Sequence, residues 1–252
     1  MNVSVETAEQ TTVYYDLPLI TEGVNSGRHR DLVGGLWEEV GQLQFEFLRE
    51  KGLKAEHKLL DLGCGCLRGG IHFIRYLEPG NYYGIDANES LLKAGYEVEL
   101  AEAGLTEKLP RGNLHCNRIF DATMFQCQFD TVVSISLFTH LPANYLRAAL
   151  ERLAPVVVPG GKLFASFFLI PDEYPFNQPM EQSAGITTTA RADPYHYRRD
   201  DLFHACTGLP WSVNIVGDWN HPRNQRMVIF ERRADESRRA SCNVQPGMGK
   251  SE

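Results

Sequence analysis

The chain has 252 residues, of which 43% are hydrophobic and 23% charged, which suits one sizeable α/β domain with additions rather than two independent domains. Its formal net charge of −7 argues against a general nucleic-acid binder, because such proteins depend on clustered lysines and arginines. The start of the chain lacks the features of a signal peptide, and no apolar run approaches the ~20 residues that span a bilayer. We therefore expect a cytoplasmic protein that binds neither nucleic acid nor membrane.

The first part of the chain is predicted to cover the rest of the protein. Residues 1 to about 30 lack strong periodicity but contain aromatic and aliphatic side chains. From Leu36 to Phe47 the apolar residues recur at helical spacing, and Gly52 is a suitable end for that helix. We expect residues 1–52 to form an N-terminal lid and helical cap.

Strands and helices then alternate along the chain, which predicts a doubly wound α/β sheet. The nearly continuous β-branched run at residues 129–136 is typical of a central strand in a parallel sheet. The inner face of the helix that follows Asn88 is expected to carry Leu91, Leu92, Gly95, Val98 and Glu99. The predicted strands are residues 57–62, 82–86, 114–116, 129–136, 163–169, 211–216 and 227–231, and the helices between them cover residues 71–77, 88–104, 142–153 and 200–206.

Two further segments stand apart from this alternation. Residues 171–199 contain four prolines with aromatic residues between them, and their length is unusual for a bare connection. We interpret them as a substrate insertion within a domain of residues 53–233. Residues 234–252 are polar and contain glycine, and a flexible tail is expected there.

The most informative motif is the glycine turn that follows the strand at residues 57–62. Gly63 and Gly65 let the backbone approach a ligand with no Cβ in the way, and an acid, Asp61, precedes them. A dinucleotide-binding fingerprint would have its third glycine at the position of Arg68. The match to NAD binding is therefore poor.

The chain resembles the class I S-adenosylmethionine (SAM) methyltransferases over about residues 36–231. The resemblance rests on motifs in the family's order and, more closely, on wording shared with a group of bacterial SAM-dependent methyltransferases. The chain departs from the family at position 67, because it has Leu67 where many members have a third glycine. This departure puts Arg68 near the cofactor carboxylate or the substrate. The motifs are Asp61-x-Gly63-x-Gly65, Asp86, Phe129-Asp130 and Pro159-Gly160-Gly161, and the shared wording is Val33-Gly34-Gly35-Leu36-Trp37, Leu67-Arg68-Gly69-Gly70, Asp193-Pro194-Tyr195-His196-Tyr197 and His221-Pro222-Arg223.

The resemblance implies a Rossmann-like sheet of seven strands, with a helical cap and an insertion after strand five, and SAM as the cofactor. Asp61 would orient the methionine ammonium, and Asp86 would accept hydrogen bonds from the ribose hydroxyls. The alternative for Asp86 is a cap on the turn to the next helix. Beside the adenine, the choice stays open between Asn117 and Asp121. The other implied cofactor residues are Gly63, Cys64, Gly65, Arg68, Ala87 and Ser136.

Catalytic and substrate residues are predicted from the segments that follow the strands. His140 is a candidate general base because imidazole titrates near neutrality, and the alternative is a structural hydrogen-bonding role. Tyr195 and His196, in the insertion, are further catalytic candidates. No metal is expected, and the six cysteines show no zinc-ligand spacing. The predicted substrate contacts are Tyr15, Trp37, Phe138, Tyr197 and His221.

The resemblance favours a methyl transferase acting on an oxygen, nitrogen or carbon atom of a small molecule, in secondary metabolism, as a monomer or homodimer. A second hypothesis keeps SAM but changes the product, as in cyclases that form azetidine-2-carboxylate and release methylthioadenosine. A third is a module that binds SAM without catalysis.

Overall fold

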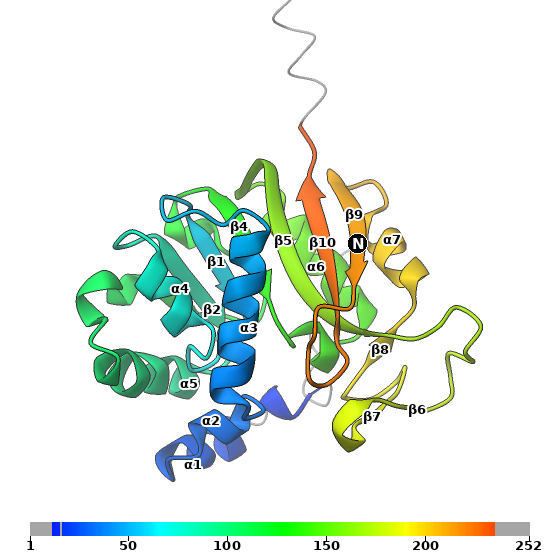
Figure 1. Cartoon of the computed structure of the whole chain (residues 1–252), viewed down its shortest axis with the longest axis horizontal. Helices are drawn as coiled ribbons and strands as arrows, with labels where there is room; N and C mark the ends of the chain where they lie inside the picture. Colours follow the sequence, from blue (N-terminus) through cyan, green and yellow to red (C-terminus); the bar gives the residue numbers. More distant parts are fainter. Residues whose placement is uncertain (1–11, 16, 235–252) are drawn as a thin grey trace, which may run out of the picture.

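The computed structural model describes residues 12–15 and 17–234, and its centre is one β-sheet (Figure 1). Seven strands follow the order β3-β2-β1-β4-β5-β10-β9, and the short β8 (His196–Tyr197) pairs with β5 as an eighth strand. The first five strands of this order pair in parallel, whereas β10 is antiparallel to both β5 and β9. This topology confirms the predicted Rossmann-like, doubly wound sheet. The seven strands are β1 (Leu59–Leu62), β2 (Tyr82–Asp86), β3 (Leu114–Cys116), β4 (Phe129–Ser134), β5 (Val157–Leu169), β9 (Trp211–Gly217) and β10 (Arg226–Arg232).

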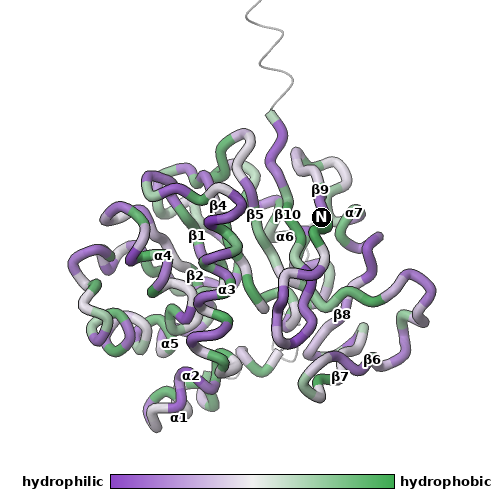
Figure 2. The backbone as a smooth tube through the Cα atoms, in the orientation of Figure 1, coloured by the Kyte–Doolittle hydropathy of each residue, from purple (hydrophilic) through white to green (hydrophobic). Residues whose placement is uncertain are grey.

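Helices cover both faces of this sheet. Successive strand residues point to opposite faces, so apolar strands need cover on both. Leu59 packs in one apolar cluster with α3 and α4, and Leu60 packs in another with α6 and α7. Both faces of the central strands are buried, and in Figure 2 the hydrophobic residues gather along these strands. The helices are α1 (Leu17–Asn25), α2 (His29–Leu32), α3 (Trp37–Glu50), α4 (Gly70–Tyr76), α5 (Glu89–Ala94), α6 (Ala143–Leu153) and α7 (Arg199–Cys206).

β5 is longer than predicted because it includes the Pro159-Gly160-Gly161 turn. Its pairing with β4 moves from Val157 opposite Phe129 to Lys162 opposite Thr131, so the turn bulges out of the ladder. Such a bulge leaves the extra residues unpaired without ending the strand. The strand therefore begins at Val157 rather than Leu163.

The helix after β2 also differs from the prediction. α5 continues into a π-helical turn, Gly95–Leu100, whose wider repeat rotates the following side chains. The expectation that Val98 faces inward was wrong, since it is 37% exposed, whereas Glu99 is 4% exposed. Glu99 Oε1 lies 2.6 Å from His29 Nε2 and accepts a hydrogen bond from Arg30 Nε at 2.6 Å, which fastens α2 to this turn.

The carboxyl ends of the parallel strands meet at one edge of the sheet, at the bottom of Figure 1. Two segments lie there: the N-terminal segment with α1 and α2, and the insertion with β6 (Met180–Glu181) and β7 (Thr187–Thr188). α1 was not predicted, and it buries Ile20 and contacts α5. The expected flexible tail lies outside the described residues apart from its first one. None of the helices described here has the length and apolar character needed to cross a membrane.

Candidate functional site

A cavity of about 350 Å³ opens at the edge where the parallel strands end. Its lining comes from the N-terminal segment, the glycine turn after β1, the end of β2, the turn after β4, the insertion and the β9–β10 loop. Its volume falls in the range of sites for small molecules, ~300–1,000 Å³. These segments, together with α3 and the loop after β3, thus contribute to one site.

The glycine turn has its conformation because two positions exclude side chains. Gly63 and Gly65 have φ of +81° and +54°, in the left-handed region that favours glycine. A Cβ on Gly65 would lie 2.8 Å from Cγ1 of Val33, so the turn also needs the missing side chain for space. Leu67 has φ of +71° and is fully buried. A leucine therefore takes a left-handed conformation at the position where related sequences have a third glycine.

Asp86, at the end of β2, joins that strand to the glycine turn. Its Oδ2 accepts the Gly65 N–H at 2.8 Å, and its Oδ1 accepts the Asn88 N–H at 2.9 Å. Burial raises the pKa of Asp86, while these two backbone donors lower it. Each carboxylate oxygen keeps acceptor capacity for a ligand hydroxyl, so capping the turn and binding a ligand are compatible.

Asp61, near the end of β1, is a buried carboxylate in the cavity wall. Its Oδ2 accepts the Tyr82 hydroxyl at 2.8 Å. Burial raises the pKa of Asp61 to about 7, although the hydrogen bond from Tyr82 and the charge of Arg68 lower it. A bound cation would stabilise the ionised form of Asp61.

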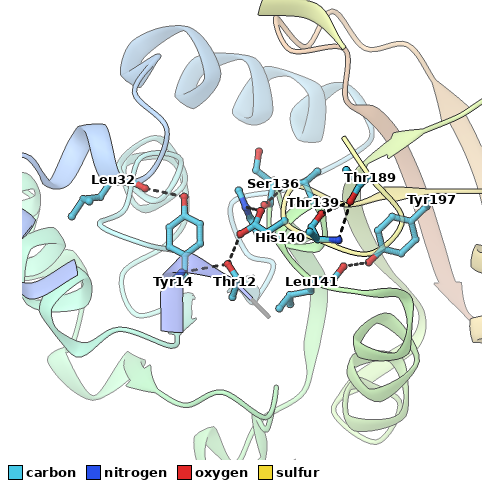
Figure 3. Close-up of polar contacts among 11 residues, drawn as sticks. Thr12, Tyr14, Leu32, Ser136, Thr139, His140, Leu141, Thr189 and Tyr197 are labelled. Carbon is cyan, nitrogen blue, oxygen red and sulfur yellow. Dashed lines mark hydrogen bonds and ion pairs between the residues drawn. The ribbon is translucent and has the colours of Figure 1, made fainter. Parts of the chain in front are cut away.

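A histidine–aspartate pair lies across the cavity opening. His140, in the turn Phe138–His140 after β4, has its Nδ1 2.6 Å from Oδ1 of Asp193 in the insertion. Thr12 donates its hydroxyl to the other oxygen of Asp193 at 2.7 Å. The ring of Tyr14 packs edge-on against His140 with centroids 4.8 Å apart, and Figure 3 shows Thr12 and Tyr14 beside His140. The N-terminal segment and the insertion therefore meet at His140.

Most of the predicted cofactor residues lie together in the wall of the cavity. The exception is Asp121, whose Oδ1 accepts hydrogen bonds from the backbone N–H and the hydroxyl of Thr123 at 2.9 and 2.7 Å. Of the two adenine candidates, only Asn117 reaches the cavity. Of the catalytic and substrate candidates, His140 and Tyr15 line it. The predicted cofactor residues in the wall are Asp61, Gly63, Cys64, Gly65, Arg68, Asp86, Ala87, Asn117 and Ser136.

The structure does not bring the other aromatic candidates to the cavity, because each is held in packing elsewhere. They anchor the covering segments to the core instead of facing a ligand. Tyr195 is buried in the core, His196 lies 2.9 Å from the carbonyl of Phe176, Trp37 stacks with Arg30, Phe138 stacks on Phe167, Tyr197 donates its hydroxyl to the carbonyl of Leu141, and His221 stacks on Trp219.

Several residues in the cavity wall, or bonded to it as Asp193 is, were not predicted to be site residues. Asp193 and Arg223 lie in segments that the sequence marked as covering loops, but their partners are 53 residues away in the first case and 189 in the second. Gln44, on α3, and Gln225, in the β9–β10 loop, also line the cavity. Spacing along the chain gives no signal for such contacts.

Part of the sequence matches a known protein family. Residues 60–163 match a family model described as a methyltransferase domain, and this stretch holds the glycine turn, Asp86 and His140. This part of the chain is therefore similar to a methyltransferase domain, and the fold around it is that of the class I methyltransferases. Within the described part of this methyltransferase, no three His, Cys, Asp or Glu side chains are grouped as a metal site would require.

Solved structures of SAM-dependent methyltransferases share the fold. Magnesium protoporphyrin IX methyltransferase from Synechocystis PCC 6803, with bound SAM, is 16% identical with a TM-score of 0.57, over 86% of this chain and 97% of that one. The amino pentose methyltransferase CalS10 from Micromonospora echinaspora, with bound SAM, is 15% identical with a TM-score of 0.58, over 82% and 95%. A SAM-dependent methyltransferase from Clostridium acetobutylicum is 11% identical with a TM-score of 0.58, over 84% and 99%.

SAM is the cofactor that a match to a methyltransferase domain implies. The wall of the cavity fits its parts. Asp61 and Asp86 lie on two neighbouring strands, and Gly63 and Gly65, which have no side chain, lie in the turn between them. The buried Asp61 lacks a cationic partner within 4.0 Å among the described residues. A cofactor that carries both an ammonium and a ribose satisfies these groups at once.

Proposed function

We propose that this methyltransferase acts on an oxygen, nitrogen or carbon atom of a small molecule, with His140 as the general base. The observation that carries the proposal is the His140–Asp193 pair, because His140 lines the same cavity as Asp61 and Asp86. A base is useful only where the attacking atom loses a proton during the reaction. We favour a hydroxyl or amine nucleophile, because a proton on oxygen or nitrogen passes to an imidazole more readily than a proton on carbon.

The chemistry asks the protein mainly for positioning. SAM supplies a methyl group that is already activated on a sulfonium, and holding two reactants in line contributes up to ~7–11 kcal/mol. We place the cofactor with its ammonium at Asp61, its ribose at Asp86 and its adenine beside Asn117. The lining of the cavity by all three residues supports this orientation.

Asp193 sets the protonation of His140 in this proposal. A carboxylate at 2.6 Å from Nδ1 favours the tautomer with hydrogen on Nδ1, which leaves the Nε2 lone pair to accept a proton. The hydroxyl of Thr12 satisfies the second oxygen of Asp193 and fixes its orientation. As the acceptor attacks, its proton passes to Nε2 of His140, and the negative charge of Asp193 stabilises the resulting imidazolium.

The segments over the cavity exclude water from this transfer. Thr12 and Tyr14 come from the N-terminal segment, and Ile186 and Pro194 come from the insertion. Because the two segments meet through the Thr12–Asp193 hydrogen bond, the base is completed when both cover the cavity. The neighbour CalS10 is involved in calicheamicin biosynthesis, which supports a place for this chain in secondary metabolism.

An assay of S-adenosylhomocysteine formation over a panel of phenols, alcohols and amines tests the proposal. His140→Ala is expected to lower turnover about 10²- to 10⁴-fold, the usual contribution of a general base, while SAM affinity stays within about twofold of wild type. The matched control is His204→Ala, because His204 is exposed on α7 and distant from the cavity wall. Equal turnover of His140→Ala and wild type contradicts the role of His140. Release of methylthioadenosine without an acceptor contradicts methyl transfer.

A further inference from the structure

Two arginines bind one short loop in the cavity wall. Arg68 donates from Nη1 to the carbonyls of Val33 at 2.8 Å and Gly35 at 3.0 Å. Arg223, from the β9–β10 loop, donates from Nη2 to the carbonyl between them, on Gly34, at 2.5 Å. Both arginines line the cavity, and Arg68 is only 9% exposed. The two guanidinium groups therefore meet over three consecutive residues.

These two positive charges lack an anionic partner. Among residues 12–15 and 17–234, no carboxylate oxygen lies within 4.0 Å of either guanidinium group. Carbonyl oxygens satisfy some of their N–H groups but carry no net charge. A buried cation without a counter-ion is costly, and such cations are normally paired. The guanidinium groups thus leave this part of the cavity wall electropositive.

His221 adds an unpaired donor beside these charges. Burial, together with the charges of Arg68 and Arg223, lowers the pKa of His221 to about 3, so the ring is neutral. Its Nδ1 accepts the backbone N–H of Arg223 at 3.2 Å, which leaves the hydrogen on Nε2. That buried Nε2 has no hydrogen-bond partner among the described residues. A third donor without an acceptor accompanies the two cations.

The two arginines come from different segments of the cavity wall. Arg68 follows the glycine turn directly, on the cofactor side. Arg223 belongs to the loop that Gln225 ties to the turn after β4, since Gln225 Oε1 accepts the Ser136 hydroxyl at 3.0 Å. Tyr14 lies between the arginines and His140. Its ring packs against His140, and the charges of Arg68 and Arg223 act on its hydroxyl.

We propose that the acceptor carries an anionic group, a carboxylate or a phosphate, which Arg223 binds while Arg68 faces the single carboxylate of SAM. This inference rests on the proposed function. A guanidinium group presents its N–H donors as a planar fork that matches both anions, so it holds the acceptor in one orientation. The acceptor would then be an acid with a separate hydroxyl or amine that reaches His140.

An anionic acceptor needs local positive charge to bind to this chain, because the chain as a whole is negative. The net charge of −7 repels anions on average, whereas Arg68 and Arg223 create a positive potential in the cavity. An acceptor without a negative group would gain nothing from Arg223.

The test uses the protein saturated with S-adenosylhomocysteine and two probes of nearly equal shape, benzoate and benzamide. Calorimetry at constant ionic strength measures the affinity of each probe. Benzoate is expected to bind at least about tenfold more tightly than benzamide, as a charge-assisted pair would give. Equal binding of the probes, or binding of neither, overturns the proposal.

Variants then assign the effect to one arginine. Arg223→Gln is expected to abolish the preference for benzoate and to leave the affinity for S-adenosylhomocysteine within about twofold of wild type. Arg226→Gln is the matched control, because Arg226 pairs with the exposed Asp218 outside the cavity wall and its loss is expected to change neither affinity. If Arg223→Gln weakens the cofactor product as much as benzoate, Arg223 serves the cofactor and the proposal is wrong. If the wild-type chain fails to bind S-adenosylhomocysteine, the fault lies with the proposed function instead.

Discussion

The affinity for SAM is expected to depend on the ionisation of Asp61. Burial raises the pKa of Asp61 to about 7, and only its ionised form attracts the SAM ammonium. The apparent Kd then scales with 1 + 10^(pKa − pH), a factor of about 2 at pH 7 and about 11 at pH 6. SAM binding should therefore weaken about fivefold as the pH falls from 7 to 6, a loss of about 1 kcal/mol.

Calorimetry measures this effect in two independent ways. The Kd is measured at both pH values, and titrations at pH 7 in buffers of different ionisation enthalpy count the protons released, expected to be about 0.5 per SAM because half of Asp61 is protonated there. Asp61→Asn is the control, since its amide oxygen can still accept the Tyr82 hydroxyl but cannot ionise. This variant should bind weakly with no change between the two pH values. A wild-type Kd that is the same at pH 6 and pH 7, with no proton release, would refute the reasoning.

Three further outcomes follow from the contacts of single residues. Asp86→Ala should weaken SAM binding by ~1–3 kcal/mol in calorimetry, because the ribose and the Gly65 amide both lose an acceptor. Gly65→Ala should lower the unfolding midpoint in a denaturant titration, since its φ of +54° and the nearby Val33 leave no room for a methyl group, whereas Gly112→Ala, with open space around it, should cost far less. Phe138→Ala should cost ~3–5 kcal/mol in unfolding free energy, because the ring is fully buried against Phe167. An unchanged unfolding midpoint for Phe138→Ala would contradict this packing role.

The sheet and the positions after its strands could be predicted because their signals are local. A run such as Phe129–Ser134 is buried on both faces and shows its burial in its own residues. Chain order alone places Asp61, Gly65 and Asp86 at one edge, since parallel strands end on the same side. The prediction of the open α/β fold thus needed no long-range information.

The covering segments could not be predicted in the same way, because their contacts join distant residues. The aromatic residues Tyr195 and Tyr197 were predicted to meet a ligand, but both are buried in the core, and Tyr197 donates its hydroxyl to the carbonyl of Leu141. A buried aromatic anchor and an aromatic ligand contact have the same composition in a sequence. Val98 faces solvent because a π-helical turn, which leaves no clear mark in the sequence, changes the helical repeat.

The cavity wall carries charges of both signs. Asp61 and Asp86 are acidic, Arg68 and Arg223 are basic, and Tyr14 packs against His140 of the His140–Asp193 pair. A cofactor that carries a sulfonium and an ammonium brings two positive charges into a chain whose buried cations are already unpaired. Asp61 and the carboxylate of SAM offset part of this charge, and an anionic acceptor offsets more. Cofactor and acceptor should therefore bind cooperatively, because each supplies charge that the other leaves uncompensated.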